Sequence, residues 1–560
     1  MSATKQRNLI TMNGQDGKPL SLDQILAALI ALLRKLDSRN IAQTLSEISG
    51  VLYDKNEIEA NEILTKKYAS LIAYPTLLPT RNNDGCTTIL FTQNAIWILN
   101  TLLTFNPLKV PEDPPEQIPI MCFPKNSLYL PSSFQDKYRL PIVELFLLTN
   151  QLISHLQNEI PEYTEAFSSK TQLYFSYSRI DEDAVAAIGK SEHLFNTDYF
   201  NKKLQEMLGM TVEQLSDYLF ILFTLVRVHQ PAKIEPDISF RRIIQEADRT
   251  EIAKLLSLLA INMRSVDATQ SQIAGALRQD FLQDVVCRGK PFLKINQRYL
   301  CLRPDLLISA LGNFPYFYLL NTLPEEQKDE FFKEFGLAFE KYITYISKRA
   351  VGERSHEYFY KKKRYGGSRS GDRHLAINDT SRAIIEIKSS RENDEVKGGS
   401  EKEIIDKFIL LKGTEKKPKG VLQLIKDAKK FRDDQGFVGE IFTIIIFRGK
   451  FPATSDFDEL VHKKITASNQ YQEYLENVQN HPTIWLTSFT CELVFSAVAQ
   501  GASLEEFLKR LALSPPSKML SEIKKFMSEK SLNGSFAPLF LDDLMSIQER
   551  VKGMIAPDVA

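Results

Sequence analysis

The sequence predicts a mixed α/β core in the C-terminal half of the chain, with helices flanking a central mixed sheet. It also predicts a large, mainly α-helical N-terminal region and a helical C-terminal tail. Two apolar stretches separated by a polar turn, at 373–377 and 382–388, predict paired strands. A third, at 440–447, is rich in β-branched residues, whereas 21–36 and 243–261 carry apolar residues at helical spacing.

Four regions follow from this pattern along the 560 residues, a length that exceeds what one hydrophobic core usually supports. Residues 1–290 are expected to be mainly helical, and residues 291–324 to form a connector that starts with a short hairpin. Residues 325–500 are expected to hold the α/β core, and residues 501–560 to form a helical C-terminal segment. No internal repeat is visible, so a solenoid is not predicted.

The composition is typical of a folded globular protein, with 43% hydrophobic and 25% charged residues. Lys and Arg total 70 and so do Asp and Glu, so the overall charge predicts no partner and any nucleic-acid signal must be local. The cysteines lie far apart, without metal-binding or redox spacing, and are expected to be reduced core thiols. They are Cys86, Cys122, Cys287, Cys301 and Cys491.

The N-terminal residues 1–13 are polar and lack the apolar stretch of a secretory signal. The most apolar run, residues 218–226, is about half as long as a bilayer requires, and is expected to be a buried helix. The sequence therefore predicts a cytoplasmic protein without membrane association.

The predicted hairpin brings two acids and a lysine together. Paired residues in a hairpin sum to a nearly constant number, so a turn centred on residues 379–380 puts Asp372 beside Ile387, adjacent to Glu386. Side chains alternate across a strand, so Glu386 and Lys388 share one face. Carboxylate oxygens are the ligands that Mg²⁺ prefers, and a bound divalent cation is one way to hydrolyse a phosphodiester.

The triplet Glu-x-Lys alone carries little information, and only its context distinguishes Glu386 and Lys388. The other copies fall in expected helices or charged loops, whereas this one ends an apolar strand. Asp379 is an alternative acid, although it lies in the turn at the wrong end of the hairpin. An incidental ion pair at a polar hairpin end is a second alternative. The other copies are Glu326/Lys328, Glu395/Lys397, Glu415/Lys417 and Glu522/Lys524.

The order of these elements resembles the PD-(D/E)XK, restriction-endonuclease-like nuclease superfamily. Its core is a helix bearing a Glu, a strand with Asp, a strand with Glu-x-Lys, a helix and a further strand. The segment 336–342 reads Gly-Leu-Ala-Phe-Glu-Lys-Tyr, similar to the G-x-x-F-E-x-Y pattern of many members, with Glu340 as the helix acid. Residues 420–431 read as the later helix and residues 440–447 as the last strand.

The resemblance implies a Mg²⁺- or Mn²⁺-dependent nuclease and assigns roles to five residues. Asp372 and Glu386 would hold the metal, together with the main-chain carbonyl of Ile387, and Glu340 is a further acid. Lys388 would orient or deprotonate the attacking water, or stabilise the developing negative charge. For Glu340, a place on the solvated side of an amphipathic helix is the alternative.

The resemblance covers roughly residues 325–490 and departs from the family pattern at Gly371, where many members have Pro before the acid. It implies an endonuclease that cuts DNA, in prokaryotic defence against foreign DNA, with the helical N-terminal region sensing a target or binding a protein partner or activator. An RNA nuclease, or a catalytically idle nuclease fold that binds nucleic acid or acts as a scaffold, remain the alternatives.

Positive charge gathers just before the proposed metal ligand. Between residues 341 and 374, ten Lys or Arg residues oppose three acids, a balance of 10 − 3 = +7. The densest run, 358–365, interleaves aromatic and basic residues, a pattern typical of nucleic-acid binding, although a solvated loop without a ligand is the alternative. The expected nucleic-acid contacts are Lys361, Lys362, Lys363, Arg364, Arg369, and, on the helix at 420–431, Gln423 and Lys426.

Overall fold

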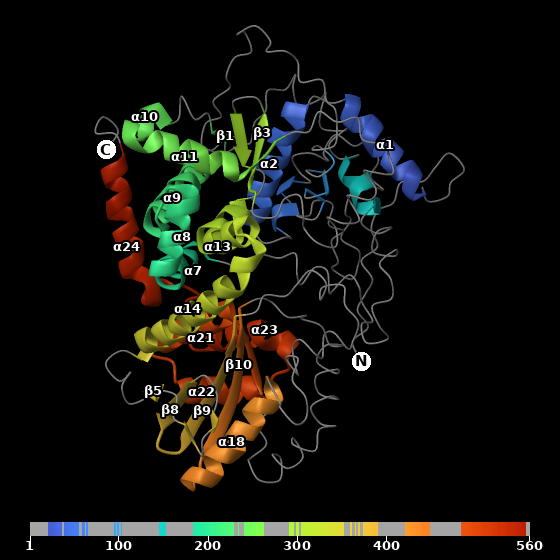
Figure 1. Ribbon diagram of the computed structural model, residues 1–560. Helices are drawn as coiled ribbons and strands as arrows, with labels where there is room; N and C mark the ends of the chain where they lie inside the picture. Colours follow the sequence, from blue (N-terminus) through green and yellow to red (C-terminus); the bar gives the residue numbers. More distant parts are fainter. Residues whose placement is uncertain are drawn as a thin grey trace. The chain divides into compact units, whose positions relative to one another are not determined.

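The computed structural model contains two compact units, each assembled from separated stretches of chain (Figure 1). One comprises Met1–Pro161, Tyr218–Leu307 and Val551–Ala560, and the other comprises Glu162–Asp217 and Ile308–Arg550. The ranges predicted from the sequence follow the chain in order, whereas these units do not. The described residues are 21–35, 38–54, 59–61, 63–64, 95–96, 98–99, 102, 145–152, 183–228, 233–234, 240–262, 290–295, 298–301, 304–351, 359–360, 364–365, 368–369, 373–389, 420–448 and 483–555.

The first unit combines helices with a small sheet of strand order β1-β4-β3-β2. β3 and β4 pair antiparallel, as the sequence predicts for this stretch, and β2 pairs parallel with β3. Its elements are α1 (Leu22–Lys35), α2 (Ser38–Asp54), most of α9 (Val212–Val228), β1 (Lys233–Ile234), α10 (Arg241–Ile243), α11 (Glu246–Leu258), β2 (Ala260–Asn262), β3 (Phe292–Ile295) and β4 (Arg298–Cys301).

The second unit contains a five-stranded sheet of order β11-β10-β9-β8-β5. β5, β8 and β9 are antiparallel neighbours, whereas β9, β10 and β11 run parallel. A two-stranded ribbon, β6 and β7, lies between β5 and β8 in the chain. The strands are β5 (Phe359–Tyr360), β6 (Arg364–Tyr365), β7 (Ser368–Arg369), β8 (Arg373–Asn378), β9 (Ser381–Lys388), β10 (Glu440–Phe447) and β11 (Ile484–Thr487).

Helices cover this sheet, so the fold is mixed α/β. Seven of the eight residues of β10 are buried, as is typical of a central strand covered on both faces. α18 packs on β9 and β10, α14 on β9, and α21 on β10 and β11 (Figure 1). The helices are α7 (Ala184–Lys190), η3 (Ser191–Phe195), α8 (Asp198–Leu208), most of α13 (Pro304–Thr322), α14 (Glu325–Val351), α18 (Val421–Gln435), α21 (Ser488–Ala499), α22 (Leu504–Ala512), η7 (Pro516–Lys518), α23 (Met519–Glu529) and most of α24 (Ala537–Met554).

The apolar run at 218–226 lies within α9 and most of its residues are buried, as the sequence predicts. None of the described helices combines the length and the apolar character that crossing a membrane requires. Two cysteines are among the described residues, Cys301 and Cys491, and both are buried free thiols. Burial, and then the charge of Glu492, raise the pKa of Cys491, which disfavours a reactive thiolate.

The register of the β8–β9 hairpin corrects the prediction by one residue. Asn378 pairs with Ser381 across the expected two-residue turn, but a bulge between Ala376 and Asn378 then shifts the pairing. Arg373 consequently pairs with Ile385, where the constant sum predicts Glu386. The prediction of Glu386 as the partner of Arg373 was therefore wrong by one position along β9, and Asp372 itself lies outside the described residues.

Glu505 of α22 holds this hairpin at its turn. Its carboxylate accepts hydrogen bonds from Asn378 Nδ2 at 2.6 Å and from the buried Ser381 Oγ at 3.0 Å. The Asn378 side chain in turn accepts from the main-chain N–H of Thr380 at 2.9 Å. Glu505 thus stabilises the turn from a distant part of the chain.

We expect Glu505→Ala to lower the free energy of unfolding by about 1–3 kcal/mol, because Asn378 and Ser381 lose a charged acceptor. Hydrogen bonds from Lys509 first, and then from Ser381 and Asn378, lower the pKa of Glu505. The stabilisation is therefore present at neutral pH and lost as the pH falls through that lowered pKa. Urea denaturation at pH 7 and below about pH 4 should show the difference shrinking in acid.

Glu506→Ala is the matched control, since the neighbouring carboxylate is half-exposed and pairs with the half-exposed Lys530, at 2.7 Å. Its cost should stay below about 1 kcal/mol. Equal costs for the two variants at neutral pH would show that Glu505 does not hold the turn.

Candidate active site

Glu386 and Lys388 lie at the C-terminal end of β9. Because they are two residues apart on one strand, both side chains project from the same face. Lys388 Nζ forms an ion pair with Glu386 Oε1, and the side chains are 24% and 4% exposed, respectively. A carboxylate so shielded from water requires a nearby cation, and in this structure Lys388 is one such group.

The end of β9 is held in a rigid setting. Its register partners on the parallel strand β10 are Ile445 for Glu386 and Phe447 for Lys388. Beyond β10, the main-chain N–H of Arg448 donates a 3.0 Å hydrogen bond to the Lys388 carbonyl. Ile387, between the two charged residues, buries its side chain in the unit. Strand pairing therefore limits how far the candidate groups can move.

Helix α14 passes beside the same end of β9. A Cβ on Gly336 would lie 3.3 Å from Oγ of Ser389, the residue that follows Lys388. Glu340 is half-buried and lies one helical turn beyond Gly336 on the same face. The helix acid therefore lies on the face of α14 that approaches the end of β9.

Several predicted site residues lie outside the described part of the chain: Asp372, Lys361, Lys362 and Lys363. Among the described residues, no group of three or more His, Cys, Asp or Glu side chains is close enough to hold a metal ion. Asp372, a member of the predicted ligand set, is not among these residues. The alternative acid Asp379 is exposed in the hairpin turn, at the opposite end of β9 from Glu386.

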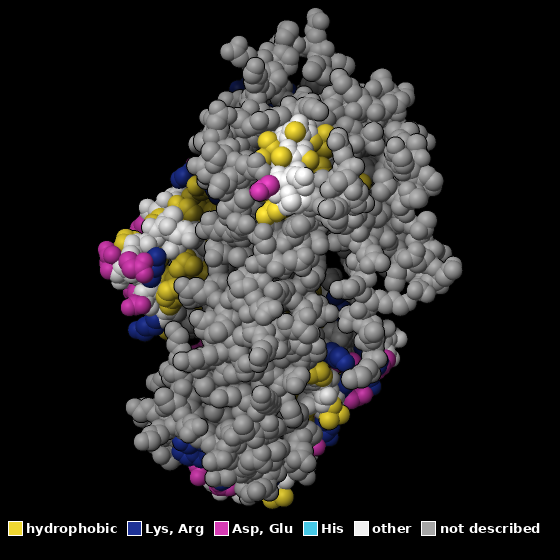
Figure 2. All heavy atoms as spheres, turned by 90° about the vertical axis from the view of Figure 1, so that its right-hand side faces the viewer, with side chains coloured by type: hydrophobic (Ala, Val, Ile, Leu, Met, Phe, Trp, Pro, Cys, Tyr) yellow, Lys and Arg dark blue, Asp and Glu magenta, His cyan; other side chains and the backbone are white. Residues whose placement is uncertain are grey.

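Arg364 and Arg369 are register partners in the β6–β7 ribbon. On α18, Gln423 is half-buried and Lys426 is exposed. In the view of Figure 2, the basic and acidic side chains of the described residues are intermixed rather than separated by sign. The described residues seen there carry no broad basic surface of the kind that alone would indicate nucleic-acid binding.

Arg448 is a residue at this end of the sheet that the sequence did not single out. Its guanidinium carbon lies 3.5 Å from the ring centre of Tyr316 and 4.5 Å from that of Phe335, and Nη2 donates to Asn313 Oδ1 at 3.2 Å. The signal was present, because Arg448 directly follows a buried strand as Ser389 does. These contacts tie the end of β10 to α13 and α14.

No protein-family model matches the sequence, and neither a curated protein nor a solved structure matches the chain. The function is therefore inferred from the residues and their geometry.

Proposed function

We propose that this chain is a metal-dependent nuclease of the PD-(D/E)XK type that hydrolyses phosphodiester bonds of DNA. The observation that carries the proposal is the order of elements around Glu386 and Lys388: α14, the antiparallel pair β8–β9, α18, and β10 parallel to β9. This order matches the one that the family resemblance implies. Two other Glu-x-Lys copies, which start at Glu326 and Glu522, lie in helices α14 and α23 and end no strand.

The donor set suits a hard divalent cation. Glu386 offers carboxylate oxygens in a water-shielded position, and Arg373 and Ile385 are register partners. Asp372 immediately precedes Arg373 in the chain, and Glu386 immediately follows Ile385. The two acids are therefore the chain neighbours of a register pair. Oxygen ligands of this kind are those that Mg²⁺ and Mn²⁺ prefer, and Glu340 and the Ile387 carbonyl are further candidates.

When bound, Mg²⁺ or Mn²⁺ would polarise the phosphate and lower the pKa of the attacking water. Lys388 serves as a counter-charge of Glu386. Once the carboxylate has another cation, the Lys388 ammonium is available to orient that water or to stabilise negative charge that develops on the phosphate. The basic residues Lys361 to Arg364, which precede Asp372 in the sequence, would then hold the phosphate backbone.

The test is cleavage of supercoiled plasmid, single-stranded DNA and RNA by the purified chain with Mg²⁺, Mn²⁺ or EDTA. We expect metal-dependent cutting of DNA that EDTA abolishes. Glu386→Ala should reduce the rate at least about 100-fold, since even residues behind the metal ligands commonly cost 10–100-fold. Glu326→Ala, in the exposed Glu-x-Lys copy of α14, is the matched control and should cut like the unaltered chain.

If the chain cuts RNA and not DNA, RNA rather than DNA is its substrate. Absence of cutting on every substrate, with nucleic-acid binding that needs no metal, would contradict the proposal and favour an idle nuclease fold. Equal activity of the Glu386→Ala variant and the unaltered chain would place the active site elsewhere.

A further inference from the structure

A buried carboxylate of the second unit joins three segments that are distant in sequence. Glu492, in α21, is fully buried. The hydroxyl of Tyr342, in α14, donates a hydrogen bond to Glu492 Oε1 at 3.0 Å. Lys190, the last residue of α7, is 6% exposed and places Nζ 3.5 Å from the same oxygen. We call Lys190, Tyr342 and Glu492 the buried triad.

Stability alone does not account for the buried triad. Removing a lysine and a glutamate from water costs several kcal/mol, and apolar residues of similar size are often at least as stabilising at such positions. What a charged and hydrogen-bonded group adds is one defined arrangement, because sliding or rotating any partner leaves a charge or a hydroxyl unsatisfied. The buried triad therefore specifies how α14 sits against α21 and α7.

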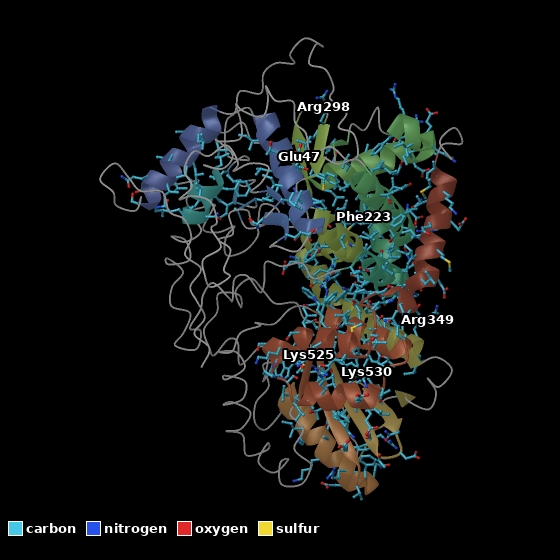
Figure 3. The ribbon with its side chains drawn as sticks, turned by 180° about the vertical axis from the view of Figure 1, so that it is seen from behind. Glu47, Phe223, Arg298, Arg349, Lys525 and Lys530 are labelled. Atoms are coloured by element: carbon cyan, nitrogen blue, oxygen red, sulfur yellow. The ribbon has the colours of Figure 1, made fainter. Side chains whose placement is uncertain are left out.

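Contacts with η3 and α24 also hold the C-terminal half of α14 in place. The ring of Tyr345 stacks on that of His193 in η3 with centroids 3.6 Å apart, and His193 Nε2 lies 3.0 Å from Asp543 Oδ1 in α24. Tyr342 lies parallel to Phe540 of α24, with centroids 6.5 Å apart. Arg349, near the end of α14, pairs with Asp542 of α24, and its position is labelled in Figure 3.

Tyr342 follows Glu340 by two residues, so the two lie about 3 Å apart along the helix axis and on nearly opposite sides of α14. The Glu340 side approaches the end of β9 through Gly336, and the Tyr342 side is bound by the buried triad. A rigid helix held on one side has a defined rotation on the other. Any rotation that breaks the Tyr342 hydrogen bond also turns Glu340.

We infer that Tyr342 is a positioning residue for the candidate active site. Through Glu492 and Lys190, it sets the rotation of α14 that Glu340 needs to contribute to metal binding beside Glu386. This inference rests on the proposed function and adds to it a structural support for the helix acid, built from residues 150 or more positions apart in sequence.

The test compares Tyr342→Phe with Tyr318→Phe in the full chain. Both changes remove one tyrosine hydroxyl from the same unit, and Tyr318, on α13, donates to the carbonyl of Met207 at 3.1 Å. Mn²⁺ binding by calorimetry, the cleavage rate and thermal unfolding are measured for each variant. The same measurements are repeated in a Glu340→Ala background.

We expect Tyr342→Phe to weaken Mn²⁺ binding about 10-fold, the lower end for a group that orients a metal ligand, while Tyr318→Phe leaves it unchanged. Tyr342→Phe should lose more thermal stability than Tyr318→Phe, because its acceptor is a buried carboxylate rather than a main-chain carbonyl. In the Glu340→Ala background, Tyr342→Phe should weaken Mn²⁺ binding no further, because its effect passes through Glu340. A merely structural role would lower the unfolding temperature without this dependence on Glu340.

Unchanged Mn²⁺ affinity in Tyr342→Phe, or a loss that adds fully to that of Glu340→Ala, would overturn the inference and leave the proposed function standing. No Mn²⁺ binding and no cleavage by the unaltered chain would overturn both. Should Tyr342→Phe fail to fold, the double variant Lys190→Met, Glu492→Gln removes both charges but keeps an amide oxygen for Tyr342. Near-normal Mn²⁺ affinity in that variant supports the tyrosine bond as the positioning contact, and a loss independent of Glu340 opposes it.

Discussion

Replacing Lys388 with Met is expected to lower the metal-dependent cleavage rate by roughly 100-fold or more, the loss typical of removing one charge-stabilising group. The same variant is expected to gain more thermal stability from Mn²⁺ than the unaltered chain gains. Lys388 and a divalent cation would act on the same shielded carboxylate of Glu386, and Met removes the competing cation. Single-turnover cleavage and thermal unfolding with and without Mn²⁺ measure the two effects.

Lys328→Met is the matched control, because Lys328 pairs with the largely exposed Glu325 on α14, 2.6 Å away. Neither its cleavage rate nor its response to Mn²⁺ should change. Unaltered cleavage by Lys388→Met would remove this lysine from the chemistry. Loss of both cleavage and Mn²⁺-dependent stabilisation would show instead that Lys388 is needed to hold Glu386 in place.

Gly439→Ala is expected to destabilise the second unit by about 3 kcal/mol, at the upper end of what inserted atoms cost in packed regions. A Cβ at this position would collide with the main-chain carbonyl of Thr380 in the β8–β9 turn and with the Phe437 ring. The next residue, Glu440, donates its N–H to the Thr380 carbonyl at 2.8 Å, the contact at which β10 joins β9. Main-chain atoms cannot rotate aside as a side chain can, so the strands must move apart. Urea denaturation measures the loss.

Gly534→Ala tests whether the loss is specific to this site, since a Cβ there meets no heavy atom within 4 Å. Its free energy of unfolding should change by less than about 0.5 kcal/mol. If Gly439→Ala were as stable as Gly534→Ala, the β8–β9 turn would be able to move away from the added Cβ at little cost. The close approach of β10 to Thr380 would then not contribute to stability.

The strands that carry the candidate site could be predicted from local pattern. β9 and β10 are long, apolar and β-branched, and a polar turn separates β8 from β9, so their existence follows from the sequence alone. The register could not be predicted, because the bulge near Asn378 is accompanied by contacts with Glu505, 127 residues away. β5 was missed for another reason: two residues are too short to show alternation.

The candidate site divides in the same way. Glu386 and Lys388 could be assigned to one strand face from their spacing, and the structure brings them into contact. The buried triad could not be predicted, because Lys and Glu are residue types that usually lie at the surface. Only tertiary packing buries Lys190 and Glu492. For their partner Tyr342 the sequence predicts a helix, but it does not predict the buried hydrogen bond to Glu492.

The discontinuous second unit has a consequence for biosynthesis. α7, η3 and α8 leave the ribosome before any strand of the five-stranded sheet exists. Residues 218–307, which belong to the first unit, are then made before the rest of the second unit follows. Until α21 and α24 emerge, the nascent chain holds Lys190 and His193 without Glu492 and Asp543. Contacts of such long range slow folding, so this unit completes only near the end of synthesis. A fragment beginning at residue 325 would lack η3, against which α14 packs, and Lys190 of α7, which pairs with Glu492.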